Sequence, residues 1–111
     1  DISKFEQKKR LADRRIDPLK QWKISPIDKS ALRHWDAYSD ARNEMLTRTH
    51  SNDLPWHVVR ADDKKRARLN VIRHLMARVD CPDKDAHLAQ PDPEVVFDFA
   101  EEHIRNGRIA P

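Results

Sequence analysis

Apolar residues recur at three- and four-residue steps over much of this chain, a pattern typical of amphipathic helices. A first helix is expected from about residue 4 to residue 15, where Ser3 and Glu6 have the spacing of a capping box. Asp17-Pro18 follows and ends it, because proline disfavours helix in the preceding residue. Residues 19–24 then form a short connector of basic and aromatic residues.

A second helix is predicted to begin at Ser25-Pro26 and to run to about Arg48. It has the clearest helical periodicity in the chain. Residues 56–60 are the one convincing strand, and Val58-Val59 gives them the continuous apolar character of a buried parallel strand. A lone strand is not stable, so its partners are expected outside this chain.

A third long helix is predicted from residue 63 to about residue 78, with Asp62 as its cap. It should pack through one apolar side, formed by Leu69, Ile72, Leu75, Met76 and Val79. A tail helix is expected over about residues 92–106, with Asp92 as cap and Gly107 as its C-terminal stop. The fold class is therefore α/β, and the chain is expected to be a mostly helical fragment with one strand.

The charge is unevenly distributed, although the net charge is only +3. Residues 4–23 carry eight cations and three acids, and residues 60–68 carry five cations and two acids. From residue 81 onward, seven acids face three cations. Two local basic patches and an acidic tail indicate a localised anionic partner.

Several kinds of site are not indicated. The single glycine, Gly107, rules out a phosphate-binding glycine loop within these residues. Cys81 is the one cysteine, which suits a cytoplasmic protein, and the six histidines lack the spacing of a metal site. No apolar run is long enough for a membrane span, and no membrane partner is expected.

The cations at the start of the third helix oppose its macrodipole, so their presence suggests an anion site. The same residues would equally suit a solvated surface. Trp22 lies among the cations of the first patch, where it could stack on a ligand or pack into the core. The proline-bounded connector would also suit a mobile lid.

Four segments resemble the polyphosphate kinase 2 family in order and spacing, from about Asp1 to His74. Residues 16–26 read Ile-Asp-Pro-Leu-Lys-Gln-Trp-Lys-Ile-Ser-Pro and resemble the family's Asp-Pro…Trp-Lys segment. Residues 3–10 resemble the start of its lid region, and residues 35–45 the helix after the lid. Residues 55–70 resemble its last strand and the following helix. The tail after Val79 matches no part of the family that we recognise.

The resemblance implies a P-loop kinase-like fold, of which residues 1–111 would be the C-terminal part. The lid would occupy about residues 3–28, the strand and basic helix about residues 56–79, and the tail helix about residues 92–106. It also implies phosphoryl transfer between inorganic polyphosphate and nucleoside mono- or diphosphates, with Mg²⁺ bound by residues outside this chain. A homo-oligomer is expected, and nucleic acid is not expected as a partner.

The residues that the resemblance assigns to polyphosphate or nucleotide binding are all cations. They are Arg14, Lys20 and Lys23 on the lid, and Lys64, Arg66 and Arg68 after the strand. The lid arginine could equally be Arg15. No residue here is assigned to catalysis or to metal binding. The alternative function is a small basic helical module that binds nucleic acid or supports assembly.

Overall fold

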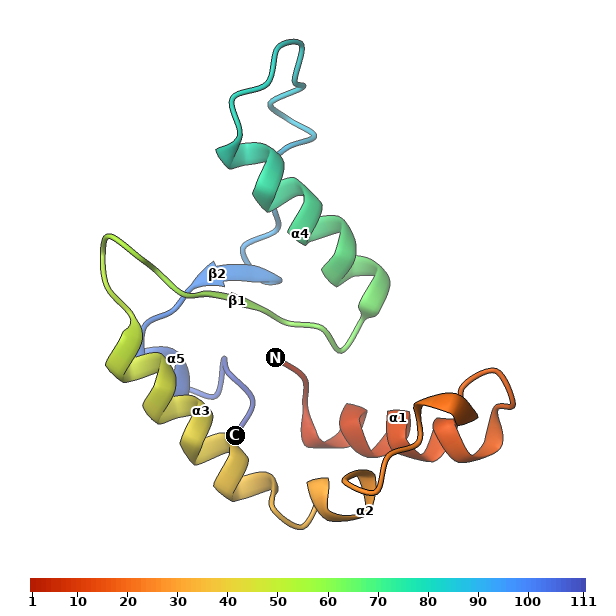
Figure 1. The fold of residues 1–111 in the computed structure, drawn as a ribbon. Coiled ribbons are helices and arrows are strands. Elements are labelled where there is room, and N and C mark those ends of the chain that lie inside the picture. The colour runs from red at the N-terminus through yellow and green to blue at the C-terminus, as the bar shows by residue number, and fades with distance from the viewer.

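The computed structural model describes residues 1–111, which form helices around a small two-stranded sheet (Figure 1). In chain order the elements are α1 (Lys4–Ile16), the 3₁₀ turn η1 (Gln21–Lys23), α2 (Asp28–Ala31), α3 (Trp35–Thr49), β1 (His57–Val59), α4 (Lys64–Arg78), β2 (Val96–Asp98) and α5 (Glu101–Arg105). The first and third predicted helices are confirmed in position, with changes at their ends. No helix combines the length and the apolar character needed to cross a bilayer.

The sheet corrects two expectations. Strand β1 pairs antiparallel with β2 inside this chain, with Val58 opposite Phe97, so it is neither alone nor parallel. The predicted tail helix over residues 92–106 is wrong, because β2 occupies its centre and α5 is only five residues long. Asp92 does accept a hydrogen bond from the Glu94 amide, but it caps a turn that leads into β2.

The second predicted helix is divided. Helix α2 ends at Ala31, and α3 begins only at Trp35 after a turn. The new start directs the Trp35 side chain into the interior, where it is 8% exposed. Its indole Nε1 donates to the Pro111 carbonyl oxygen at 2.5 Å. The interruption therefore allows α3 to bind the C-terminal segment.

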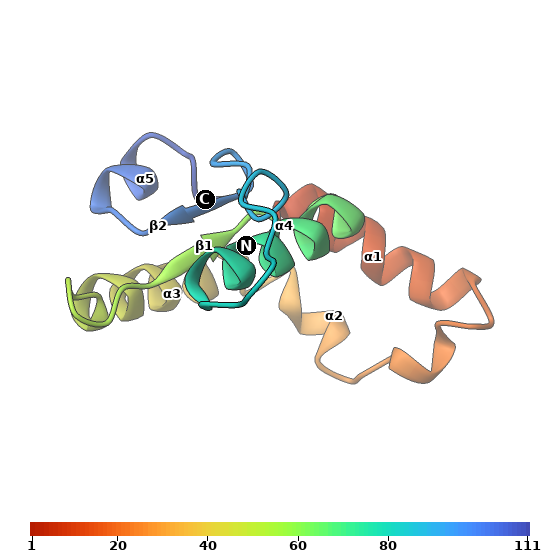
Figure 2. The ribbon, with the colours of Figure 1, turned by 90° about the horizontal axis from the view of Figure 1, so that it is seen from above.

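The apolar core lies between α3, the sheet and the residues after α5. It consists of Leu46, Val58, Phe97, Phe99 and Ile109, with Ile104 packed against it. Only 13 of the 111 residues are buried, and the radius of gyration is 16.4 Å. A compact domain of 100 residues would have about 13 Å. Helix α1 accordingly extends away from the core in two views (Figures 1 and 2), and α4 does so in Figure 1.

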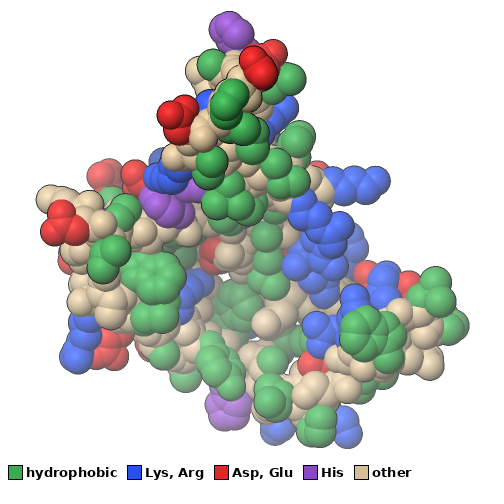
Figure 3. All heavy atoms as spheres, turned by 45° about the horizontal axis from the view of Figure 1, so that its top comes forward, with side chains coloured by type: hydrophobic (Ala, Val, Ile, Leu, Met, Phe, Trp, Pro, Cys, Tyr) green, Lys and Arg blue, Asp and Glu red, His purple; other side chains and the backbone are tan.

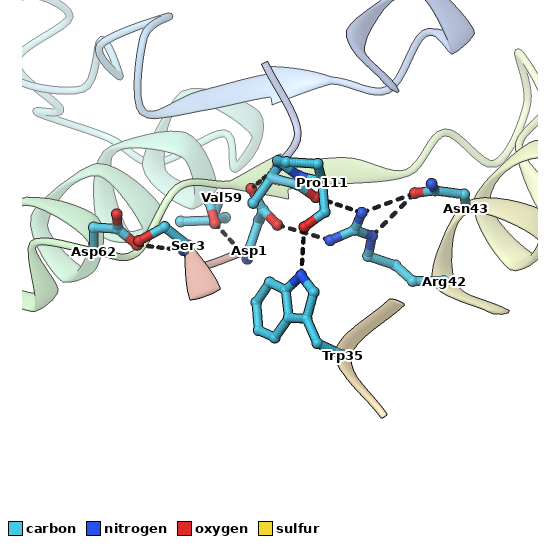
Figure 4. Close-up of polar contacts among 9 residues, drawn as sticks. Asp1, Ser3, Trp35, Arg42, Asn43, Val59, Asp62 and Pro111 are labelled. Carbon is cyan, nitrogen blue, oxygen red and sulfur yellow. Dashed lines mark hydrogen bonds and ion pairs between the residues drawn. The ribbon is translucent and has the colours of Figure 1, made fainter. Parts of the chain in front are cut away.

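Polar contacts join the N-terminal segment to both β1 and the C-terminal segment (Figure 4). The Asp1 backbone nitrogen donates to the Val59 carbonyl at 2.8 Å, and the Ser3 amide donates to Asp62 Oδ1 at 2.8 Å. Arg42 of α3 donates to Asp1 Oδ1 at 3.2 Å and to the Ala110 carbonyl at 2.6 Å. These contacts fix the start of α1 beside the end of β1.

Helix α4 buries the side opposite to the one that the sequence predicted. Its buried residues are Ala67 and Asn70. The predicted packing side is mostly exposed, at 48% for Leu69, 58% for Ile72 and 57% for Leu75. The apolar pattern correctly identified a helix, but its apolar side is covered only in part, by the loop over residues 83–89, with which it lines a pocket.

Candidate polyanion-binding site

The connector between α1 and α2 forms one side of the candidate site. Helix α1 ends at Ile16, and the chain turns through Asp17 and Pro18 into η1. The Trp22 indole donates to the Leu19 carbonyl at 3.0 Å, yet the residue is 78% exposed. Its packing into the core, one of the two interpretations from the sequence, is therefore wrong. Lys23 Nζ lies 5.0 Å from the centre of the Trp22 ring.

Arg14 joins the two ends of this connector. Its Nη1 donates to both carboxylate oxygens of Asp28, at 2.9 and 3.0 Å, and reaches the Lys23 carbonyl at 3.3 Å. Asp28 therefore neutralises Arg14, which acts as a structural tie in this arrangement. The neighbouring Arg15 is exposed and forms no ion pair.

The start of α4 forms the other side of the site. Its cap is Asp63, one residue later than expected, because the Asp63 carboxylate accepts from the amides of Lys65 and Arg66 at 2.9 and 3.0 Å. These backbone bonds, that of Arg66 first, lower the pKa of Asp63. Asp62 instead accepts from Ser3 and so ties α1 to this turn.

Arg10 connects the two sides and was not among the residues singled out in the sequence. It pairs with Glu6 at 2.7 Å and donates to the carbonyls of Ala61 and Asp62. The Glu6–Arg10 spacing of four residues was a visible signal for an intrahelical pair. The carbonyl contacts could not be predicted, since they join positions about 50 residues apart.

The structure brings together cations that are distant in sequence. The positive charge of Arg10 lowers the pKa of Lys64, and desolvation and the charges of Lys23 and Lys20 add to this effect. We call Lys20, Lys23, Lys64 and Arg68 the basic surface. Arg68 belongs to it because it follows Lys64 by four residues and so lies on the same side of α4. Figure 3 shows Lys and Arg side chains gathered between α4 and α1.

The six predicted binding residues differ in whether an acid neutralises them. Arg14 pairs with Asp28, and Lys20 pairs with Asp17 at 2.9 Å, which raises the Lys20 pKa. Arg66 is directed away from the basic surface to the Asp92 carboxylate, and this bond raises the Arg66 pKa. Lys23, Lys64 and Arg68 form no ion pair. These three are the cations most available to an anion.

No group of three or more histidine, cysteine or acidic side chains is arranged to hold a metal ion. The acids close to the basic surface are already engaged. Asp17 binds Lys20, and Asp63 caps α4. The residues present therefore do not fit a magnesium site, and no chemical step through a metal follows from them.

Most of this chain matches a family of known proteins. Residues 1–87 match the model of the polyphosphate kinase 2 family, so the match extends past Val79 into the segment that the sequence motifs left unplaced. The chain is 47% identical over 96 residues to the NDP-polyphosphate phosphotransferase 2 of Ruegeria pomeroyi. The aligned region covers 86% of this chain and 28% of that protein.

Two relatives come from Pseudomonas aeruginosa. Its GDP-polyphosphate phosphotransferase is 51% identical, over 86% of this chain and 27% of its own length. Its ADP-polyphosphate phosphotransferase is 50% identical, over 80% of this chain and 30% of its own length. The chain thus spans less than a third of each of these curated relatives. With the family match covering most of its residues, the chain belongs to the polyphosphate kinase 2 family.

Proposed function

We propose that this chain is the C-terminal part of a polyphosphate-dependent nucleotide phosphotransferase with a P-loop kinase-like fold. It would supply the lid and a polyanion-binding surface. The enzyme would move phosphoryl groups between inorganic polyphosphate and nucleoside mono- or diphosphates. The names of the relatives support the substrate class, since each refers to polyphosphate and a nucleotide.

The observation that carries the proposal is the meeting of Lys20 and Lys23 with Lys64. Like charges repel, and the charge of Arg10 first, then desolvation and the charges of Lys23 and Lys20, lower the pKa of Lys64. A bound polyanion would relieve this repulsion, because each phosphate adds negative charge and hydrogen-bond acceptors to the surface. A chain of phosphates fits this surface better than a single small anion, since its cations come from two separate elements.

Phosphoryl transfer requires positioning and neutralisation of dispersed negative charge. Lys23, Lys64 and Arg68 would neutralise the polyphosphate, and Arg14 would hold the Lys23 backbone through its bond to that carbonyl. The exposed Trp22 ring would cover the ligand on the connector side. Catalytic groups and the acids that bind Mg²⁺ would lie in other parts of the enzyme.

The connector would act as the moving part of the lid. Asp17-Pro18 and the Arg14–Asp28 pair bound it, so it can swing as a unit over a ligand held on α4. The exposed apolar side of α4 supports a homo-oligomer or further packing within the enzyme. The exposed free thiol of Cys81 is consistent with a cytoplasmic location.

The test is a kinetic comparison in the full-length enzyme. Lys23→Ala and Lys64→Ala should each raise KM for polyphosphate by about tenfold, or ~1.4 kcal/mol, with little change in KM for the nucleotide. Lys29→Ala is the matched control, because Lys29 is exposed on α2 and forms no ion pair. Equal effects on both substrates, or no polyphosphate-driven nucleotide phosphorylation by the parent enzyme, would refute the proposal.

A further inference from the structure

A cluster of titratable side chains joins the far end of α4 to the sheet, away from the basic surface. His57 of β1 and Asp98 of β2 are register partners, and His57 Nδ1 lies 2.6 Å from Asp98 Oδ1. The ring of His74 from α4 meets the His57 ring edge to face, with centroids 4.6 Å apart. Arg78, one turn later on α4, completes the cluster.

The contacts of Arg78 require one protonation state of His74. Arg78 Nη1 lies 2.8 Å from His74 Nδ1, and the guanidinium also reaches His74 Nε2. A guanidinium only donates hydrogen bonds and a neutral imidazole has one accepting nitrogen, so one of these two contacts is a hydrogen bond, and that bond requires neutral His74. Protonation of His74 would therefore remove the acceptor and place two cations in contact.

We propose that His57, His74, Arg78 and Asp98 form an acid-sensitive junction, which holds the C-terminal half of α4 on the sheet at neutral pH and releases it on acidification. The junction carries four groups from three elements. When the His74 ring is protonated, it lies as a second cation beside Arg78, and the single carboxylate of Asp98 faces both. That carboxylate is 66% exposed and so offsets the added charge only weakly.

The sign of the effect follows from His74. Desolvation first, and then the charges of Arg78 and His57, lower its pKa below the ordinary 6.5. The undocked helix therefore binds a proton at a pH where the docked helix does not. Docking is at full strength above about pH 6.5 and weakens as the pH falls toward the lower pKa of the docked state.

Release should be confined to the C-terminal half of the helix. Asn70 is 2% exposed and holds the other half, because its Oδ1 accepts from the Asp92 amide at 2.7 Å. Arg66 also binds Asp92. Acid would thus loosen the helix beyond Asn70 and the loop that follows it, while Lys64 and Arg68 stay in place. The inference is therefore independent of the proposed function.

Amide hydrogen exchange of the full-length protein at pH 7 and pH 5.5, corrected for intrinsic rates, tests the junction. Protection of residues 74–78 should fall relative to residues 67–70, by at most about tenfold per pH unit, the limit for one proton. His74→Gln should abolish this fall, because glutamine stays neutral and keeps an acceptor for Arg78. Asp98→Asn should enlarge it, because it removes the one anion of the junction.

His87→Gln is the matched control, since His87 is exposed in the loop after α4, and it should behave like the parent protein. NMR titration of the His74 ring gives a second measurement that does not depend on any variant. Its midpoint should lie below the ordinary histidine pKa of 6.5. Equal protection of residues 74–78 at both pH values, persistence of the fall in His74→Gln, or a His74 midpoint at or above 6.5 would overturn the proposal.

Discussion

Arg66 and Asp92 form an ion pair that joins the first turn of α4 to the turn before β2. The pair lowers the pKa of Asp92 and raises that of Arg66, so each holds the other in its charged form. The same contact withdraws Arg66 from the basic surface. Lys64 and Arg68 are four residues apart and share a side of the helix, whereas Arg66 lies two residues from each and faces away.

The two arginines of α4 should therefore respond differently to removal. In the full-length enzyme, Arg68→Ala should raise KM for polyphosphate by about three- to tenfold, because it removes an unpaired cation from the surface. Arg66→Ala should change KM for polyphosphate by less than about twofold. Steady-state kinetics at constant salt measure both. An effect of Arg66→Ala as large as that of Arg68→Ala would contradict the orientation of α4.

Asn70 should be important for stability rather than for binding. The residue is buried, its Nδ2 donates to the Arg66 carbonyl at 2.9 Å, and its Oδ1 accepts from the Asp92 amide at 2.7 Å. Asn70→Ala leaves that amide without its partner, which should lower the free energy of unfolding by about 1–3 kcal/mol. Urea denaturation measures the loss. Asn52→Ala, in an exposed loop, is the control and should change the same quantity by less than about 0.5 kcal/mol.

The helices were predictable because their signals are local. Ser3 accepts from the Glu6 amide at 3.1 Å, as the capping-box spacing predicts, and Gly107 has the positive φ of 73° that favours glycine after a helix. Only half of the capping box forms, since the Ser3 amide bonds to Asp62 and Glu6 turns to Arg10. The Glu6–Arg10 pair is local and has a visible spacing, but the Ser3–Asp62 bond joins distant positions and leaves no mark in the local sequence.

Strand β2 was missed for the same reason. Asp92-Pro93 resembles the start of a helix, and the apolar residues that follow suit either structure. Pairing with β1, nearly 40 residues earlier in the chain, selects the strand. The basic surface was only partly predictable from the sequence. Its cations were evident from composition, but only the three-dimensional arrangement separates the unpaired Lys23 from the paired Lys20.

Replacement of Arg42 by lysine should destabilise the fold, although the positive charge would be kept. Its guanidinium contacts Asp1, Asn43 and the Ala110 carbonyl at once, and the Asp1 side chain is only 8% exposed. A single ammonium group cannot make this planar set of bonds. Arg42→Lys should lower the free energy of unfolding by about 2 kcal/mol. Arg48→Lys is the control, because Arg48 is 76% exposed and pairs only with Glu44, and it should be nearly neutral.

Asp63 caps α4, and its charge should make this cap sensitive to acid. The Asp63 carboxylate accepts two backbone bonds at the positive end of the helix, and its pKa is lowered from the ordinary 3.8. The unfolded chain therefore takes up this proton at a higher pH than the folded chain. The contribution of Asp63 is fully present above about pH 4 and is lost as the pH falls through the lower pKa of the folded state.

Asp63→Asn separates the cap from its charge, since asparagine caps a helix about as well as aspartate but does not titrate in this range. The thermal midpoint of the variant should stay close to that of the parent protein at pH 7 and should fall less between pH 5 and pH 3. Asp53→Asn is the control, because Asp53 is exposed in the loop before β1 and caps no helix. If Asp63→Asn fell as steeply as Asp53→Asn, the charge of Asp63 would contribute nothing at the start of α4. The start of α4, which carries Lys64 of the basic surface, would then be stabilised by the hydrogen bonds of the cap and not by its charge.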